Sequence, residues 1–113
     1  YAPTTAPTRS NRSMEYEVIA RITARLKKAI ECEDFAVLVE ALHENRKLWR
    51  RIALNVADPA NELSQELRAR MYYLSEFTNH QTSAVLNDRQ SAIPLLDVNT
   101  AIMRGLKQEG TMR

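Results

Sequence analysis

The sequence is poor in the residues that make turns, disulfides and membrane spans. Its 113 residues include two glycines, four prolines and one cysteine. Sheet proteins need frequent turns, in which Gly and Pro recur, so their scarcity argues against a β-sandwich or barrel. The lone Cys32 excludes an intramolecular disulfide and a cysteine-based zinc site. No apolar run reaches the ~18 residues of a membrane-spanning helix. We therefore expect an all-α protein in a reducing, cytoplasmic setting.

Neither the charge nor the motifs of the chain point to catalysis or to nucleic acid. The net charge of +2 is too small to imply a nucleic-acid partner by itself. The sequence has no Ser/His/Asp order and no Gly-rich phosphate loop. His43 and His80 are too few and too far apart to suggest a metal site. We predict a protein that is not an enzyme, without cofactor, metal or small-molecule substrate.

Apolar residues recur at helical spacing, which predicts a small antiparallel bundle of three long helices and a short C-terminal helix. Residues 1–12 lack this periodicity and are predicted to be a disordered N-terminal arm. Residues 13–107 are expected to form one helical domain, and 108–113 a frayed tail. The first helix is expected over residues 13–31, with Ser13 as its N-cap. Its buried stripe is Met14, Val18, Ile19, Ile22, Leu26 and Ile30.

The second helix has the clearest limits. Asp34 is a good N-cap, and Asp58-Pro59 ends the helix after Ala57, because a residue before proline is pushed out of the α region. Asn45 lies at the centre of the apolar face. The other members of that face are Phe35, Val37, Leu38, Ala41, Leu42, Leu48, Trp49, Ile52, Ala53 and Val56.

Two further helices are expected after it. The third spans about residues 64–86, and its apolar face is Leu63, Leu67, Met71, Leu74, Phe77 and Val85. A polar connection over residues 87–91 leads to the fourth. Pro94 is tolerated in the first turn of this last helix, which is expected to end near Leu106 or Lys107. Its apolar face is Leu95, Val98, Ile102 and Leu106.

Polar residues interrupt the apolar faces of three helices. They are Asn45 in the second helix, Thr78 with Gln81 in the third, and Asn99 in the fourth. Two interpretations remain open. These residues either meet in a hydrogen-bonded network inside the core, or they line a groove that receives a partner helix.

Outward-facing apolar residues favour a protein partner, although scattered surface hydrophobics are common. On the second helix these are Val39 and Leu54, and on the third they are Tyr72 and Tyr73. Val39 and Leu54 lie on the outer half of the second helix, whereas Tyr72 and Tyr73 flank the apolar face of the third.

A basic cluster in the second helix raises RNA binding as an alternative. It comprises Arg46, Lys47, Arg50 and Arg51. The competing interpretation is a solvated helix face, in which Glu44 pairs with Lys47 and positive charge suits the C-terminal half of the helix. No aromatic platform is interleaved with these bases, and proteins that bind single strands usually need one. The solvated face is therefore favoured.

Four ordered blocks resemble the bacterial flagellar biosynthesis regulator FlaF. They are PTRSNRSMEYEVIARITARL (7–26), ALHENRKLWRRIALNVADPAN (41–61), ELRARMYYLSEFT (66–78) and DVNTAIMRGL (97–106). The similarity covers about residues 7–107. One departure is Ser64, at a position where proline is expected in many relatives. It affects only the start of the third helix.

The resemblance implies a cytoplasmic helper that binds flagellin as a secretion chaperone or adaptor and acts with the regulator FlbT. The alternative is a post-transcriptional regulator that contacts flagellin mRNA or FlbT. The positions that match the family are Asn45, Arg46, Trp49, Leu67, Phe77, Thr78, Asn99, Ile102 and Arg104. The candidate partner-binding residues are Asn45, Arg46, Trp49, Tyr72, Phe77, Thr78, Gln81, Asn99 and Met103.

Overall fold

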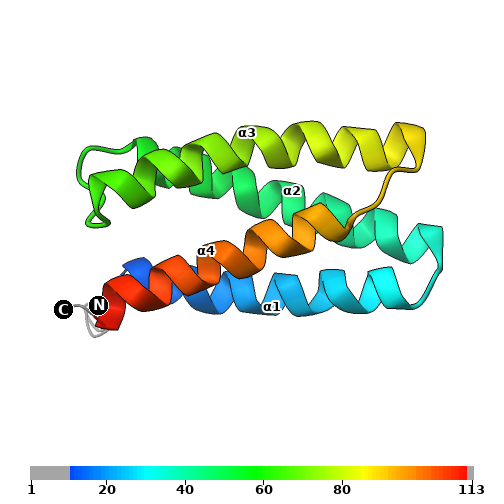
Figure 1. The fold of residues 1–113 in the computed structure, drawn as a ribbon, viewed down its shortest axis with the longest axis horizontal. Helices are drawn as coiled ribbons and strands as arrows, with labels where there is room; N and C mark the ends of the chain where they lie inside the picture. Colours follow the sequence, from blue (N-terminus) through cyan, green and yellow to red (C-terminus); the bar gives the residue numbers. More distant parts are fainter. Residues whose placement is uncertain (1–10, 112–113) are drawn as a thin grey trace, which may run out of the picture.

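The protein is a bundle of four antiparallel helices. The computed structural model describes residues 11–111, and the side chains of residues 16–108. Its helices are α1 (Asn11–Glu31), α2 (Phe35–Ala57), α3 (Gln65–Asp88) and α4 (Ile93–Thr111) (Figure 1). No strand occurs among the described residues. The predicted all-α bundle is confirmed. Most of the predicted disordered arm, and the side chain of Met14, lie outside what the structure describes.

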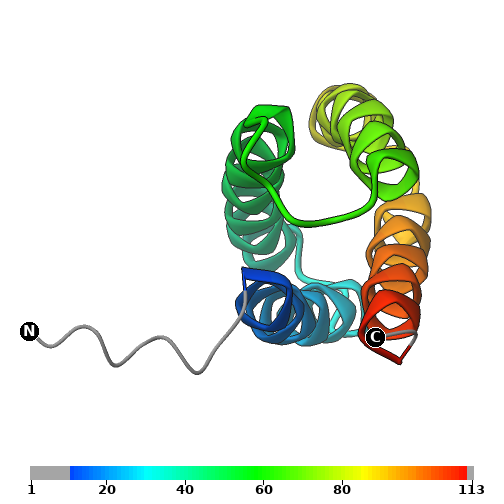
Figure 2. The same cartoon turned by 90° about the vertical axis from the view of Figure 1, so that its left-hand side faces the viewer.

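The helices follow one another around the bundle. In the end-on view α1 lies between α2 and α4 (Figure 2). The packed pairs are α1 with α2, α2 with α3, α3 with α4, and α1 with α4. The start of α1, the end of α4 and the α2–α3 connection share one end of the bundle (Figure 1).

The predicted limits of α2 are confirmed by its caps. The Asp34 carboxylate accepts hydrogen bonds from the backbone N–H groups of the second and third helical residues. At the other end, the helix stops at Ala57 and Asp58 adopts an extended backbone, as expected of a residue before proline. Ser64 is the N-cap of α3, and its Oγ accepts from the Leu67 N–H at 3.1 Å.

Other predicted helix limits were wrong. α1 begins at Asn11, so Ser13 lies inside the helix instead of capping it. α3 runs to Asp88, two residues beyond the predicted end. The fourth helix is not short: it has 19 residues against 21 in α1 and ends at Thr111. Its apolar periodicity stops at Leu106, but the helix continues through the polar residues that follow and through Gly110, because glycine weakens a helix without ending it.

Gly105 lies where α4 comes close to the start of α3. A Cβ atom at this position would be 3.3 Å from Leu67 Cδ1. We expect Gly105→Ala to raise the free energy of unfolding by about 0.5 kcal/mol. The gain in helix propensity is about 1 kcal/mol, and moving the terminal methyl group of Leu67 offsets part of it. Urea denaturation measures the change. Gly105→Leu should destabilise the protein, and equal stability of the two variants would contradict this account.

Two apolar clusters form the core. The larger one contains Ile19, Ile22, Leu48, Trp49, Ile52, Val56, Leu63, Leu67, Met71, Ile102 and Leu106. The smaller one contains Leu26, Ala29, Ala41, Leu42, Val85, Ala92 and Leu95. Nearly all of these residues were predicted to be buried. The exceptions are Ala29 and Ala92, which were on none of the predicted apolar faces. Conversely, Val37 was predicted to lie on the apolar face of the second helix, but it lies in the first turn of α2 and is 42% exposed.

Candidate functional site

One polar residue from each helix lies, in sequence, between residues of the two apolar clusters. We call Thr23, Asn45, Thr78 and Asn99 the polar layer. Asn45 and Asn99 are 0% exposed and Thr78 is 1% exposed, so the layer is part of the core and separates its two apolar halves. A buried polar group is stable only when its hydrogen-bonding atoms have partners, and this requirement decides how the layer is built.

Asn99 joins three helices through this layer. Its Oδ1 accepts a hydrogen bond from the Trp49 indole N–H of α2 at 2.8 Å. Its Nδ2 donates to Asn45 Oδ1 of α2 at 2.8 Å and to Thr23 Oγ1 of α1 at 3.0 Å. Because an indole nitrogen can only donate, the amide orientation of Asn99 follows from Trp49. Every hydrogen-bonding group of the Asn99 side chain therefore has a partner.

The layer is incomplete on the side of α3. Asn45 Nδ2 and Thr78 Oγ1 are buried and have no hydrogen-bond partner in the described structure. One turn further along α3, the buried Thr82 hydroxyl donates to the Thr78 carbonyl at 2.6 Å. The two threonines thus differ: the Thr82 hydroxyl is satisfied within its own helix, whereas the Thr78 hydroxyl is not.

The sequence left two interpretations of these polar residues open, a core network and a groove for a partner helix. Each interpretation applies to different residues. Asn45 and Asn99 belong to a core network and are closed to direct contact in this structure. Thr23 completes that network and was missed, although it lies four residues after Ile19 on the same helix face. Thr78 is buried but unsatisfied, and it also lines a cavity at the surface between α2 and α3.

This α2–α3 pocket brings together three of the predicted site residues. It has a volume of about 250 Å³ and is lined by Arg46, Trp49, Arg50, Ala53, Ser75, Glu76, Thr78 and Asn79. The Arg46 guanidinium spans the two helices, donating to Asn79 O at 2.9 Å and to Ser83 Oγ at 2.8 Å. Its Nε is buried and has no partner. The pocket therefore combines two unsatisfied polar atoms with an aromatic wall.

Exposed apolar residues occur on both helices one turn from residues that line this pocket. Leu54 follows Arg50 by one turn on α2, and Tyr72 precedes Glu76 by one turn on α3. Because the two helices are antiparallel, both residues lie towards the same end of the bundle (Figure 1). Leu54 is 74% exposed and Tyr72 is 49% exposed. We call the pocket together with these two exposed residues the α2–α3 surface.

Three other predicted site residues do not line this pocket. Phe77 is half-buried on α3. Gln81 Nε2 donates to the Ser91 carbonyl at 3.1 Å and so holds the α3–α4 connection. Met103 packs against the larger apolar cluster.

The basic cluster of α2 is divided between different surfaces. Arg46 and Arg50 line the α2–α3 pocket, whereas Lys47 lines a groove on the opposite side of α2. Glu44 forms its ion pair with Arg25 of α1, so the predicted Glu44–Lys47 pair was wrong. Arg46 and Arg50 thus lie on the α3 side of α2, and Lys47 lies on the α1 side.

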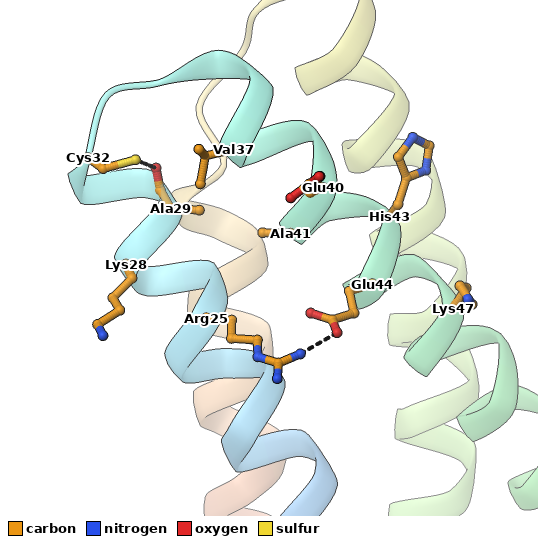
Figure 3. A pocket seen from close by; sticks show the side chains of 10 residues that line it. All are labelled: Arg25, Lys28, Ala29, Cys32, Val37, Glu40, Ala41, His43, Glu44 and Lys47. Carbon is orange, nitrogen blue, oxygen red and sulfur yellow. Dashed lines mark hydrogen bonds and ion pairs between the residues drawn. The ribbon is translucent and has the colours of Figure 1, made fainter.

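The groove between α1 and α2 is a second concave surface, and the sequence did not single it out. It has a volume of about 670 Å³, and Ala29, Val37 and Ala41 supply its apolar part (Figure 3). Charged side chains surround them, and the Arg25–Glu44 ion pair crosses the groove (Figure 3). None of the unsatisfied buried atoms of the described residues belongs to this groove. For this reason we place the candidate site on the α2–α3 surface.

Two negative findings hold for residues 11–111. No three or more His, Cys, Asp or Glu side chains come together in an arrangement that could hold a metal ion. No helix in this range has the length and apolar character needed to cross a membrane.

Comparison with known protein families identifies one match. The family described as flagellar protein FlaF matches residues 1–106, which include every residue of the polar layer and of the α2–α3 surface. The resemblance inferred from the four sequence blocks is confirmed. Neither the curated proteins nor the solved structures contain a match to this chain.

Proposed function

Since the chain belongs to the FlaF family of flagellar proteins, we propose that it is a non-enzymatic cytoplasmic chaperone or adaptor that binds flagellin. In this role it acts with FlbT to promote flagellin production and export. Free flagellin has helical terminal segments that assemble by burying their apolar faces. A protein that covers one such segment prevents premature assembly and presents the chain to the export machinery.

The α2–α3 surface is the observation that carries this proposal. It combines a pocket between two antiparallel helices with two exposed apolar side chains, Leu54 of α2 and Tyr72 of α3. Amphipathic helices bind to such surfaces by laying apolar side chains, spaced three or four residues apart, into the groove between two helices. Aromatic residues such as Tyr72 are the ones that most often dominate the binding energy of an interface.

The matched pair Tyr72 and Tyr73 tests the surface. Both tyrosines are exposed, but the ~100° step between helical neighbours turns Tyr73 away from α2. We expect Tyr72→Ala to weaken flagellin binding about tenfold, equivalent to ~1.4 kcal/mol, and Tyr73→Ala to leave it nearly unchanged. Calorimetric titration of purified flagellin, and of flagellin lacking its terminal segments, measures both effects. Equal affinity for the truncated flagellin would contradict the proposal.

The salt dependence of binding separates this function from the regulatory alternative. A post-transcriptional regulator that contacts flagellin mRNA would lose affinity steeply as salt rises. It would also depend on Arg51, which is exposed and does not line the α2–α3 pocket. Arg46 is unsuitable for this test because it holds α2 to α3. Apolar docking of a flagellin helix predicts a weak salt dependence. Immobilised protein offered flagellin, FlbT and RNA together identifies the preferred partner.

A further inference from the structure

The α2–α3 pocket contains two buried polar atoms that the protein itself leaves without partners. They are Arg46 Nε, which can only donate, and Thr78 Oγ1, whose hydroxyl can donate or accept. Native proteins satisfy the large majority of such atoms, so each exception calls for an explanation. Both residues line the same cavity, and Thr78 is only 1% exposed. A single acceptor group entering the pocket could satisfy both.

The charge of the lining indicates which acceptor fits. Two arginines, Arg46 and Arg50, face one acid, Glu76, so the lining carries a net charge of +1. No ion pair between Arg50 and Glu76 occurs in the described part of the chain. A carboxylate would neutralise the lining, whereas an amide would only satisfy the hydrogen bonds. Charge-assisted hydrogen bonds to a carboxylate are also roughly twice as strong as neutral ones.

We propose that the α2–α3 pocket receives a side-chain carboxylate, Asp or Glu, from the helix that the protein binds. Arg46 Nε–H and the Thr78 hydroxyl donate to its oxygens, and Arg50 at the pocket mouth adds positive charge. Tyr72 and Leu54 contact the apolar side chains of the same helix one turn further along. This inference rests on the proposed function for the identity of the partner, but the chemistry of the pocket can be tested without flagellin.

Trp49 provides the signal for this test. It is the only tryptophan in the sequence and it lines the pocket. The full chain is titrated with sodium propionate at constant ionic strength, while Trp49 fluorescence and the indole N–H resonance are recorded. Propionamide and sodium chloride are the controls. We expect a saturable change with propionate, and an affinity at least fivefold weaker with propionamide.

Three variants show whether the response comes from the pocket. Thr78→Val and Arg50→Gln should each weaken propionate binding at least threefold. Thr82→Val should leave it unchanged, because the Thr82 hydroxyl is already bonded to the helix backbone. Because Arg50 is exposed, Arg50→Gln should not disturb the fold. It therefore tests the pocket even if Thr78→Val, a substitution in the core, perturbs folding. A response that is absent, equal for propionamide, or unaffected by Thr78→Val and Arg50→Gln would overturn the proposal.

The flagellin experiment identifies the carboxylate. Each acidic residue of the flagellin terminal helices is replaced by its amide, Asp→Asn or Glu→Gln. One such replacement should weaken binding about tenfold, and Thr78→Val should largely remove that difference. Full affinity after every replacement would overturn the inference while leaving the proposed function intact. A saturable propionate response without any flagellin binding would support the pocket and reject flagellin as its partner.

Discussion

Replacing Asn99 with alanine is expected to lower the free energy of unfolding by about 3–4 kcal/mol. The side chain makes three hydrogen bonds within the core, to Trp49, Asn45 and Thr23. Its removal leaves the Trp49 indole N–H and Asn45 Oδ1 buried without partners, and each such group costs ~1–3 kcal/mol. The cavity left behind adds to this loss. This is the largest single-residue effect on stability that we predict. It is a large part of the total, because small domains are stable by only ~5–15 kcal/mol.

The next residue supplies the control. The Thr100 side chain is exposed, and its hydroxyl bonds only to the Leu96 carbonyl of its own helix, at 2.9 Å. Thr100→Ala should change the stability by less than about 0.5 kcal/mol. Urea denaturation, followed by circular dichroism and Trp49 fluorescence, measures both variants. Similar losses for the two would mean that the polar layer contributes little to stability.

A double-mutant cycle isolates the hydrogen bond between Trp49 and Asn99. Trp49→Phe removes the indole N–H but keeps an aromatic ring, so Asn99 Oδ1 loses its donor. Neighbours in one hydrogen-bond network typically couple by ~0.5–3 kcal/mol. We expect the double variant, Trp49→Phe with Asn99→Ala, to lose less stability than the sum of the losses of the two single variants. Once one of the two residues is replaced, the other has already lost its partner, so replacing it costs less.

Local signals predicted most of the fold. Asp34 caps α2 and Asp58-Pro59 ends it because these effects depend only on the backbone of adjacent residues. The burial of Asn45 was predicted from its place at the centre of the apolar face of its helix. Like a helix cap, helical periodicity depends only on residues close in sequence. The length of α4 was missed because its apolar periodicity stops at Leu106, whereas the helix continues through the polar residues that follow, to Thr111.

The site was less predictable because its contacts are non-local. Arg46 was interpreted as part of a basic cluster, but its guanidinium bonds to the Asn79 carbonyl, 33 residues away. Glu44 similarly pairs with Arg25 across the α1–α2 packing. Helical periodicity places a side chain on a face of its own helix, but how two helices are aligned decides which side chains meet. The sequence therefore indicated the unusual residues without indicating their partners.

The polar layer also explains how this bundle selects one arrangement of its helices. Leucine-rich faces can pack in several alignments of similar energy, whereas the Asn99 hydrogen bonds form only when α1, α2 and α4 are aligned as observed. A buried asparagine in a coiled coil fixes helix alignment in the same way. The layer makes no such bond to the α3 side chains. The position of α3 therefore depends on apolar contacts and on hydrogen bonds outside the layer, among them those of Arg46 to the Asn79 carbonyl and of Arg68 to the Val56 carbonyl. The unsatisfied Thr78 is a consequence of this arrangement.

Thr78→Val is expected to stabilise the protein by about 1 kcal/mol, because valine keeps the shape and removes a buried hydroxyl that has no partner. Thr82→Val should have the opposite sign and cost about 0.5 kcal/mol, since it deletes the bond to the Thr78 carbonyl. The two buried threonines are one turn apart on α3, so propensity and volume changes cancel in the comparison. Thermal and urea denaturation of both variants gives the difference.

Stability and binding should move in opposite directions at Thr78. If its hydroxyl is only a packing defect, Thr78→Val will be more stable and will bind flagellin as well as the parent chain does. If the hydroxyl receives a partner carboxylate, the same substitution will be more stable and will bind more weakly. A group that costs stability in the free protein and contributes affinity in the complex is typical of functional sites. Measuring both quantities on one variant therefore separates a structural accident from a binding residue.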